Sequence, residues 1–192
     1  NSLSILGGVR GEQTETDAKG PIQQANGTVT GRQRREGKYR DVFPGVHLRY
    51  SPNRNLVSRL SYSNGIGRPS FDALMPLETV NEAAQTVNVR NAALRPQYSD
   101  NFDATAEYYF EPVGMLTASA FLKEVKDFQY TDSSQFVGSG PDNGFAGLYE
   151  GYRITTSRNG GRARYRGFEL AYQQQFTFLP GFWRGFGLGL NY

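Results

Sequence analysis

Residues 98–130 contain two successive runs in which apolar and polar side chains alternate with a period of two. In the first run, the even positions from 102 to 110 are Phe, Ala, Ala, Tyr and Phe, and the odd positions between them are Asp, Thr, Glu and Tyr. After a break at residues 111–114, the second run places Leu116, Ala118, Ala120 and Leu122 on one face. Because successive side chains of a strand point to opposite faces, the two runs predict one long β-hairpin.

The length of this hairpin is its most informative property. Each arm continues for about ten residues, whereas a globular strand has roughly 5 to 6 residues and a tilted strand that crosses a bilayer needs roughly 9 to 11. An apolar face, a polar face, a tight turn at one end and a long polar loop at the other are typical of an outer-membrane barrel. Apolar and polar side chains also alternate in the strands of a soluble β-sandwich, so the rest of the chain must decide between a sandwich and a membrane barrel.

The same pattern recurs along the whole sequence. Seven alternating runs are predicted as strands, near residues 3–11, 46–50, 56–63, 102–110, 116–123, 168–178 and 186–192. Short turns are expected at residues 51–55, 111–114 and 179–182, and long polar loops at 12–38, 68–97 and 131–160. The first loop contains an Asn26-Gly27 turn signal. The sequence leaves open whether residues 149–157 form a further strand.

The connections are sorted by length, since long loops and short turns alternate along the chain. Outer-membrane barrels place short turns on the periplasmic side and long loops outside. Aromatic residues stand beside the short turns, where an interfacial girdle is expected, at Tyr50, Phe110, Phe178, Phe182 and Trp183. We therefore predict an all-β, antiparallel, up-and-down transmembrane β-barrel. Seven strands are expected to be an incomplete piece, because single-chain bacterial barrels have even strand numbers and open edges are costly in lipid.

The composition agrees with a barrel and excludes several other classes of protein. The chain is 38% hydrophobic and 20% charged, which is not typical of a disordered segment, and no window approaches 18 uninterrupted apolar residues. Its mean hydropathy of −0.58 fits a barrel, because half of each strand faces a polar lumen. No sequence resembling a signal peptide begins at Asn1. A basic run at residues 32–40 is more typical of a solvated loop than of a nucleic-acid site, so no nucleic-acid partner is predicted.

No residue set indicates catalysis or a metal. Cysteine is absent and His47 is the only histidine, which excludes thiolate and multi-histidine metal sites and offers no Ser/His/Asp set. The glycine-rich segment 138–144 lacks the Lys-Ser/Thr of a phosphate loop, and Asp132, Asp142 and Asn143 do not have the spacing of a calcium loop. Asn26-Gly27-Thr28 matches a glycosylation sequon, which carries little weight in a bacterial outer membrane. We predict a protein without cofactor, metal or enzymatic activity.

Four short motifs, taken in their order, resemble the barrel of TonB-dependent outer-membrane receptors. A strand ending at Tyr62 and a small-residue stretch lead into Arg-Pro-Ser-Phe at 68–71, and the sequence Asn-Ala-Ala-Leu-Arg-Pro at 91–96 is similar to the family's Asn-Pro-x-Leu-Lys-Pro. Lys-x-x-x-Asp-Phe at 123–128 and Gly-Phe-Glu-Leu at 167–170 complete the series. The resemblance covers residues 39–192, with Ala92 and Arg95 in place of the family's Pro and Lys.

The resemblance implies a barrel of about 22 strands in the bacterial cell outer membrane, with an N-terminal plug and a TonB box. Residues 1–192 are expected to form one partial barrel domain without plug, TonB box or signal peptide. The implied partners are outer-membrane lipid, the TonB energy-coupling complex through the absent N-terminal part, and a small-molecule or oligosaccharide ligand. The implied function is the energy-coupled uptake of a ferric siderophore, cobalamin, haem or an oligosaccharide.

Candidate ligand-binding residues follow from the strand faces and the loops. The lumen-facing candidates are His47, Arg49, Arg59, Glu107, Lys123 and Glu169, and the loop candidates are Arg68, Phe71, Tyr149 and Tyr152. Each has an alternative interpretation, because barrel interiors are polar whether or not they bind a ligand, and loop aromatics also pack against their own loop. Two other functions remain open at this stage: a soluble β-sandwich that binds a ligand, and a passive outer-membrane diffusion barrel.

Overall fold

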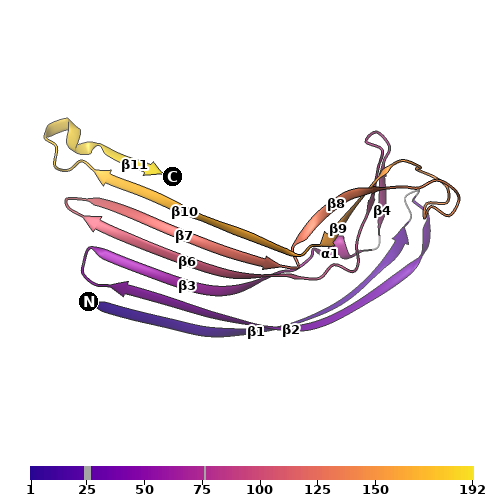
Figure 1. Cartoon of the computed structure of the whole chain (residues 1–192), viewed down its shortest axis with the longest axis horizontal. Coiled ribbons are helices and arrows are strands. Elements are labelled where there is room, and N and C mark those ends of the chain that lie inside the picture. The colour runs from indigo at the N-terminus through magenta and orange to yellow at the C-terminus, as the bar shows by residue number, and fades with distance from the viewer. Residues whose placement is uncertain (24–26, 76) are drawn as a thin grey trace.

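The computed structural model describes residues 1–23, 27–75 and 77–192, and most of these residues lie in β-strands (Figure 1). Among them, seven strands form one long antiparallel sheet with the order β1-β2-β3-β6-β7-β10-β11. Their bounds are β1 Ser2–Gln23, β2 Val29–Ser51, β3 Leu56–Gly67, β6 Gln97–Phe110, β7 Gly114–Lys126, β10 Arg162–Gln175 and β11 Gly187–Asn191. The predicted up-and-down arrangement of seven strands is confirmed, as an open, curved segment of sheet.

A second, smaller sheet is built from the long connections and has the order β4-β5-β9-β8. Its strands are β4 Glu78–Asn81, β5 Thr86–Val89, β8 Gln129–Phe136 and β9 Arg153–Asn159, and the short helix α1 spans Phe71–Leu74. Strands β5 and β9 are parallel and join the β3–β6 connection to the β7–β10 connection. Figure 1 shows this small sheet at the end of the long sheet that lies opposite to both termini. The long β3–β6 and β7–β10 connections thus lie at one end of the sheet, and the short β2–β3 and β6–β7 turns lie at the other, as predicted.

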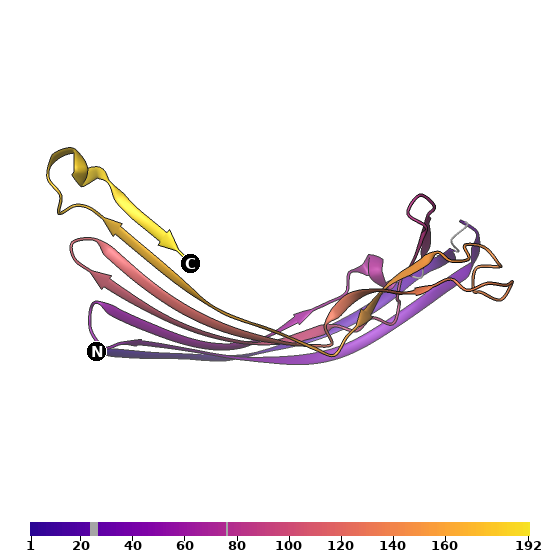
Figure 2. The ribbon, with the colours of Figure 1, turned by 45° about the horizontal axis from the view of Figure 1, so that its top comes forward.

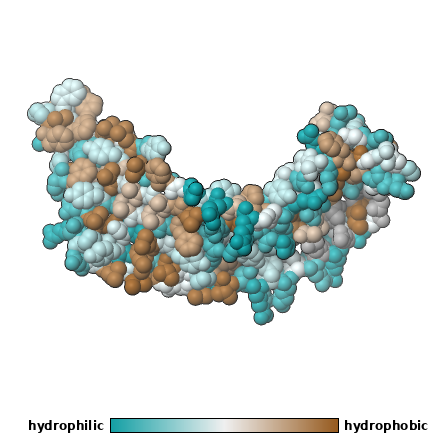
Figure 3. Space-filling model, viewed as in Figure 1, coloured by the Kyte–Doolittle hydropathy of each residue, from teal (hydrophilic) through white to brown (hydrophobic). Residues whose placement is uncertain are grey.

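Cross-strand register places the apolar positions of neighbouring strands in common rows. Leu48 of β2 pairs with Leu60 of β3, Leu60 pairs with Ala104 of β6, and the row continues through Ala120 to Phe168. Large members of this row remain exposed, with Leu60 at 55% and Phe168 at 60%. In Figure 3 the hydrophobic side chains gather over the half of the long sheet that carries the termini. This half therefore presents a continuous apolar face, while the two most buried hydrophobic residues, Val87 and Val137, lie in or beside the small sheet.

The prediction of a loop over residues 12–38 is wrong. Strands β1 and β2 continue through this region as an antiparallel ribbon, which we call the distal ribbon (residues 12–23 and 29–38) and which extends beyond the long sheet in Figure 2. Charges rather than apolar side chains alternate here: Glu15 pairs with Lys38 at 2.5 Å, and Asp17 pairs with Arg34 at 2.8 Å. A search for apolar alternation therefore missed it. Asn26, of the predicted turn and sequon, lies outside the described residues.

Two further boundaries differ from the sequence interpretation. Strand β10 ends at Gln175, so Phe176 and Phe178 belong to the turn and not to the strand. The backbone N–H of Phe176 donates to the carbonyl of Phe186 at 2.9 Å, and a 3-10 helix at Gly181–Gly185 completes this turn. The segment 149–157, left open above, contributes to β9. The short turn at residues 111–114 is confirmed.

Candidate functional site

The polar face of the long sheet carries a row of side chains that crosses five strands. Arg59 of β3 lies opposite Arg49 of β2 on one side and Thr105 of β6 on the other. The row continues through Ser119 of β7 to Glu169 of β10. Because neighbouring strands are about 4.8 Å apart, Arg59 and Glu169 are separated by about 14 Å. Two guanidinium groups therefore stand at one end of the row and a carboxylate at the other.

Glu107 balances one of the two arginines. Its Oε1 forms an ion pair with Nη1 of Arg59, and its Oε2 accepts a hydrogen bond of 2.7 Å from the hydroxyl of Tyr109. The Glu107 side chain is 18% exposed and that of Arg59 is 44% exposed. Charge-assisted hydrogen bonds of this kind hold both partners in place. Arg49 forms no ion pair within the described part of the chain, although its charge acts on Glu107 from the neighbouring strand.

A groove of about 290 Å³ opens between these residues, which we call the lumen groove. Its polar lining consists of Ser4, His47, Arg49, Arg59, Ser61, Asp103 and Thr105. The fold thus brings together three of the lumen-facing candidates, namely His47, Arg49 and Arg59, with Glu107 bound to the last. Two adjacent guanidinium groups give the groove the capacity to bind a carboxylate, phosphate or other anionic group.

Lys123 and Glu169 do not join the lumen groove. Lys123 of β7 lies opposite Asn101 and Tyr165, four residues along the strand from Ser119, which is a distance of about 13 Å. Glu169 lies three strands away from Arg59. Strand parity alone puts both on the polar face, but the register between strands separates them from the arginines.

Arg68 connects the end of β3 to the distal ribbon. Its Nη2 donates to Oε2 of Glu12 at 2.5 Å and to the hydroxyl of Thr14 at 3.1 Å, and its Nε donates to the hydroxyl of Tyr39 at 3.1 Å. The hydrogen bond from Arg68 lowers the pKa of the Glu12 carboxyl. The guanidinium of this loop candidate is therefore engaged with three partners from β1 and β2.

Tyr149 and Tyr152 lie together in the connection between β8 and β9. Their ring centroids are 5.5 Å apart, and Phe145 contacts Tyr149 edge-on at 6.3 Å. Asn143 holds this segment together, because its amide donates to the carbonyls of Gly138 and Leu148 and accepts from the backbone of Phe145. Phe71, the remaining loop candidate, is 66% exposed in α1.

Beside this aromatic cluster lies a second polar pocket of about 500 Å³ on the small sheet. Two arginines line it together with Phe145: Arg90, which pairs with Asp72 at 2.5 Å, and Arg158, which pairs with Asp132 at 3.0 Å. Sequence reasoning missed both arginines. They come together only through the parallel pairing of β5 with β9, for which the sequence contains no local signal.

The described residues offer neither a metal site nor a helical membrane span. Within residues 1–23, 27–75 and 77–192, no three His, Cys, Asp or Glu side chains are grouped so that they could hold a metal ion. The same residues include no helix of sufficient length and apolarity to cross a membrane.

A single antiparallel sheet with one exposed apolar face, one polar face and connections sorted by length defines the wall of a transmembrane β-barrel. Residues 1–192 match the family model described as TonB dependent receptor-like, beta-barrel, and the chain belongs to this family. No curated protein matches the chain.

Solved structures with the same fold are receptors and transporters. A double mutant of the Serratia marcescens hemophore receptor HasR, in complex with its hemophore HasA and heme, superposes with a TM-score of 0.60 at 13% identity, covering 89% of this chain and 29% of HasR. The copper transporter OprC superposes with a TM-score of 0.58 at 18% identity, and the match covers 91% of this chain and 25% of OprC. A mutant of the ferric enterobactin receptor PfeA of Pseudomonas aeruginosa superposes with a TM-score of 0.55 at 16% identity, and the match covers 74% of this chain and 21% of PfeA. The chain therefore spans less than a third of each of these proteins.

Proposed function

We propose that this chain forms part of the barrel wall of a bacterial outer-membrane receptor that takes up a scarce nutrient with energy supplied through TonB. The observation that carries the proposal is the contrast between the two faces of the sheet in a member of this family. The outward face is apolar over several strands, and the inward face bears the lumen groove with Arg49 and Arg59. Coupling to TonB is assigned to parts of the receptor outside residues 1–192, and neither nucleic-acid binding nor catalysis is proposed.

The proposed ligand is a small anionic molecule, such as a ferric siderophore or haem. The arginines of the lumen groove support this choice, as do Arg90 and Arg158 beside the aromatic ring of Phe145 on the small sheet. The small sheet would make the first contact and the lumen groove the second, because the two lie at successive positions along the strands. Among the solved structures with this fold, HasR is described with heme and PfeA with enterobactin.

Uptake by cells that produce the full-length receptor tests the proposal. A deletion strain complemented with the receptor should accumulate a labelled ferric siderophore or haem, and accumulation should stop when TonB is removed. Uptake that continues without TonB would instead establish a passive diffusion barrel. Recovery of the receptor in the soluble fraction after a carbonate wash would contradict the membrane assignment altogether. Uptake restricted to cobalamin or an oligosaccharide would support the assignment as a receptor and contradict the proposal of a small anionic ligand.

Arg49→Gln tests the lumen groove within the same assay. Loss of one unpaired guanidinium should weaken ligand binding about tenfold, because a hydrogen bond to a charged group contributes about 1.5 to 3 kcal/mol. Arg184→Gln is the matched control, since Arg184 lies in the turn at the opposite end of β10. Equal ligand affinity of the two variants would mean that Arg49 does not contact the ligand.

A further inference from the structure

The outward face of the long sheet carries an apolar groove of about 470 Å³, which we call the outward groove. Its floor is formed by Ala104 of β6 and Ala120 of β7, which lie directly opposite each other. On either side, the same row continues with Leu60 and Phe168, so that two small side chains stand between two large ones. The next row, Ala106 opposite Ala118, repeats the small pair. The residues that line the groove come from β2, β3, β6 and β7, so the depression runs across these four strands, and Ala120 and Leu122 form its end on β7.

Basic side chains stand above one end of the outward groove. Lys126 of β7 and Arg162, Arg164 and Arg166 of β10 share the outward parity of Phe168, and all four are exposed; we call them the basic cluster. Arg166 lies opposite Leu122, which lines the groove. Arg166 is therefore about 7 Å along the strand from the row of Phe168, at the mouth of the groove.

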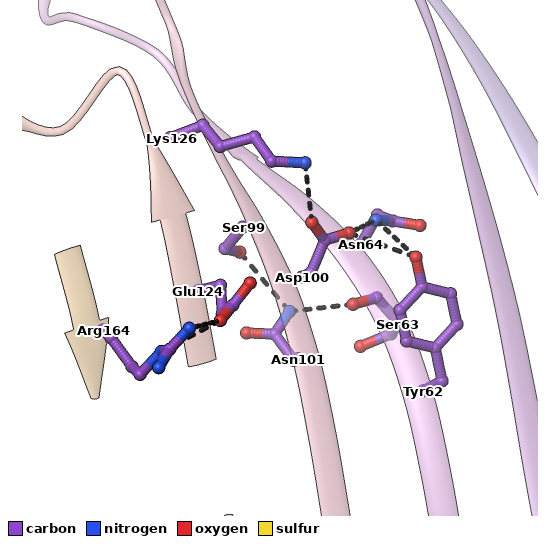
Figure 4. A network of polar contacts seen from close by, with 9 residues as sticks. All are labelled: Tyr62, Ser63, Asn64, Ser99, Asp100, Asn101, Glu124, Lys126 and Arg164. Atoms are coloured by element: carbon purple, nitrogen blue, oxygen red, sulfur yellow. Dashed lines mark hydrogen bonds and ion pairs between the residues drawn. The ribbon is translucent and has the colours of Figure 1, made fainter. Parts of the chain in front are cut away.

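Carboxylates neutralise only part of the basic cluster. Figure 4 shows Lys126 with Asp100, at 3.0 Å, and Arg164 with Glu124, at 2.9 Å. Asp100 is held in turn by the hydroxyl of Tyr62 and by the amide of Asn64. Within the described residues, Arg162 and Arg166 form no ion pair. Four cations thus face two carboxylates, and the surface retains an excess of two positive charges beside an apolar groove.

The position of the basic cluster along the strands determines what it can meet. It lies at the end of β7 and β10 that leads into the long connections, which is the outer side of the membrane in a barrel of this kind. Cations that face hydrocarbon are costly, whereas cations at the level of the headgroups attract anionic lipid. A guanidinium group also matches phosphate in charge and geometry.

We propose that the outward groove and the basic cluster together bind one phosphorylated lipid molecule. Arg166, at the mouth of the groove, contacts its phosphate, the other members of the basic cluster add positive charge beyond it, and one acyl chain lies over Ala104 and Ala120 beside Leu60. This site is on the opposite side of the barrel wall from the lumen groove. The inference rests on the proposed placement in the outer membrane and is independent of the transported ligand.

Native mass spectrometry of the full-length receptor tests the site with two matched lipids. Dioleoyl phosphatidic acid and dioleoylglycerol have the same acyl chains and differ only in the phosphate. The receptor should retain phosphatidic acid, and Arg166→Gln should weaken that binding about tenfold. Lys123→Gln is the matched control, because Lys123 carries the same charge at nearly the same height on the opposite face. Equal retention of the two lipids, or equal effects of the two variants, overturns the proposal.

A second pair of measurements tests the acyl chain separately. Ala120→Phe fills the outward groove and should weaken phosphatidic acid binding, while the heat-modifiable electrophoretic mobility of the receptor reports that the barrel is folded. Glycerol 3-phosphate, offered as a competitor without acyl chains, should fail to displace the lipid. Full displacement by glycerol 3-phosphate, or unchanged binding by folded Ala120→Phe, overturns the groove as the acyl site. Nutrient uptake by Arg166→Gln should be retained, so failure of the lipid site leaves the transport proposal standing.

Discussion

Strands β1 and β2 run continuously through two surroundings, and the two halves are stabilised in different ways. Near the termini, Ile5 pairs with Leu48 on a face that belongs to the apolar side of the barrel wall. In the distal ribbon, the same register pairs Glu15 with Lys38. The positions that carry apolar side chains near the termini carry charged side chains in the distal ribbon, such as Glu15, Asp17 and Lys38. The backbone of a strand sets the period of two, and the surroundings of each half determine which side chains occupy its two faces.

The largest expected effect concerns the membrane half. Ala106→Arg or Leu170→Arg, on the outward face, should lower the free energy of unfolding of the full-length receptor by about 2 to 4 kcal/mol, because each places a charge in hydrocarbon. Thr105→Arg and Gln173→Arg, on the polar face of the same strands, should cost little. Denaturant titration of the receptor in lipid vesicles measures all four. Equal losses at both parities would mean that the two faces do not differ as described.

An intermediate effect is expected inside the barrel wall. Glu107→Gln removes the partner of Arg59 and leaves Arg49 and Arg59 opposite each other without compensation. We expect a loss of about 1 kcal/mol, since the pair is only partly shielded from solvent. Glu169→Gln is the control, because Glu169 has no ion-pair partner among the described residues. The same denaturant titration compares the two variants. An equal loss of unfolding free energy in both would mean that the effect comes from the overall charge of the lumen and not from the Glu107–Arg59 ion pair.

A smaller and local effect is expected where the distal ribbon meets the long sheet. The pKa of Glu12 is lowered from its usual value of 4.5 by the hydrogen bond from Arg68. A carboxyl with a depressed pKa stabilises the folded state above its unfolded value, and this stabilisation is lost as the pH falls through the folded pKa. The ribbon should therefore be anchored at neutral pH and loosen below about pH 4.5.

A spin label at Gln13→Cys in the full-length receptor measures this loosening. The label should become more mobile on acidification in the otherwise unaltered protein, and it should be mobile at every pH in Glu12→Gln. Asp17→Asn is the comparison, because Asp17 pairs with Arg34 farther along the ribbon and does not contact Arg68. Mobility independent of pH in all three proteins would mean that Arg68 does not anchor the ribbon.

The same two halves explain what the sequence could predict. The membrane strands and the turn at residues 111–114 follow from local alternation and local turn residues, so they could be located. The distal ribbon cannot be located in this way, because its alternating side chains are charged and not apolar. Strand parity placed Arg49, Arg59 and Glu107 on one face, but the lumen groove also depends on the register between strands. Likewise, Arg90 and Arg158 meet across a parallel strand pair formed by two distant connections.

The smallest expected effect concerns the ion pairs of the distal ribbon. The side chains of Lys38 and Glu15 are 58% and 59% exposed, and ion pairs in such surroundings contribute between 0 and about 1 kcal/mol. Lys38→Gln should therefore change the free energy of unfolding by less than about 0.5 kcal/mol, far less than Ala106→Arg on the outward face. A loss comparable to that of Ala106→Arg would show that charge pairing, and not the backbone ladder of β1 and β2, holds the ribbon together. The comparison between the two halves would then reverse, because the ribbon would depend on its side chains as strongly as the membrane half does.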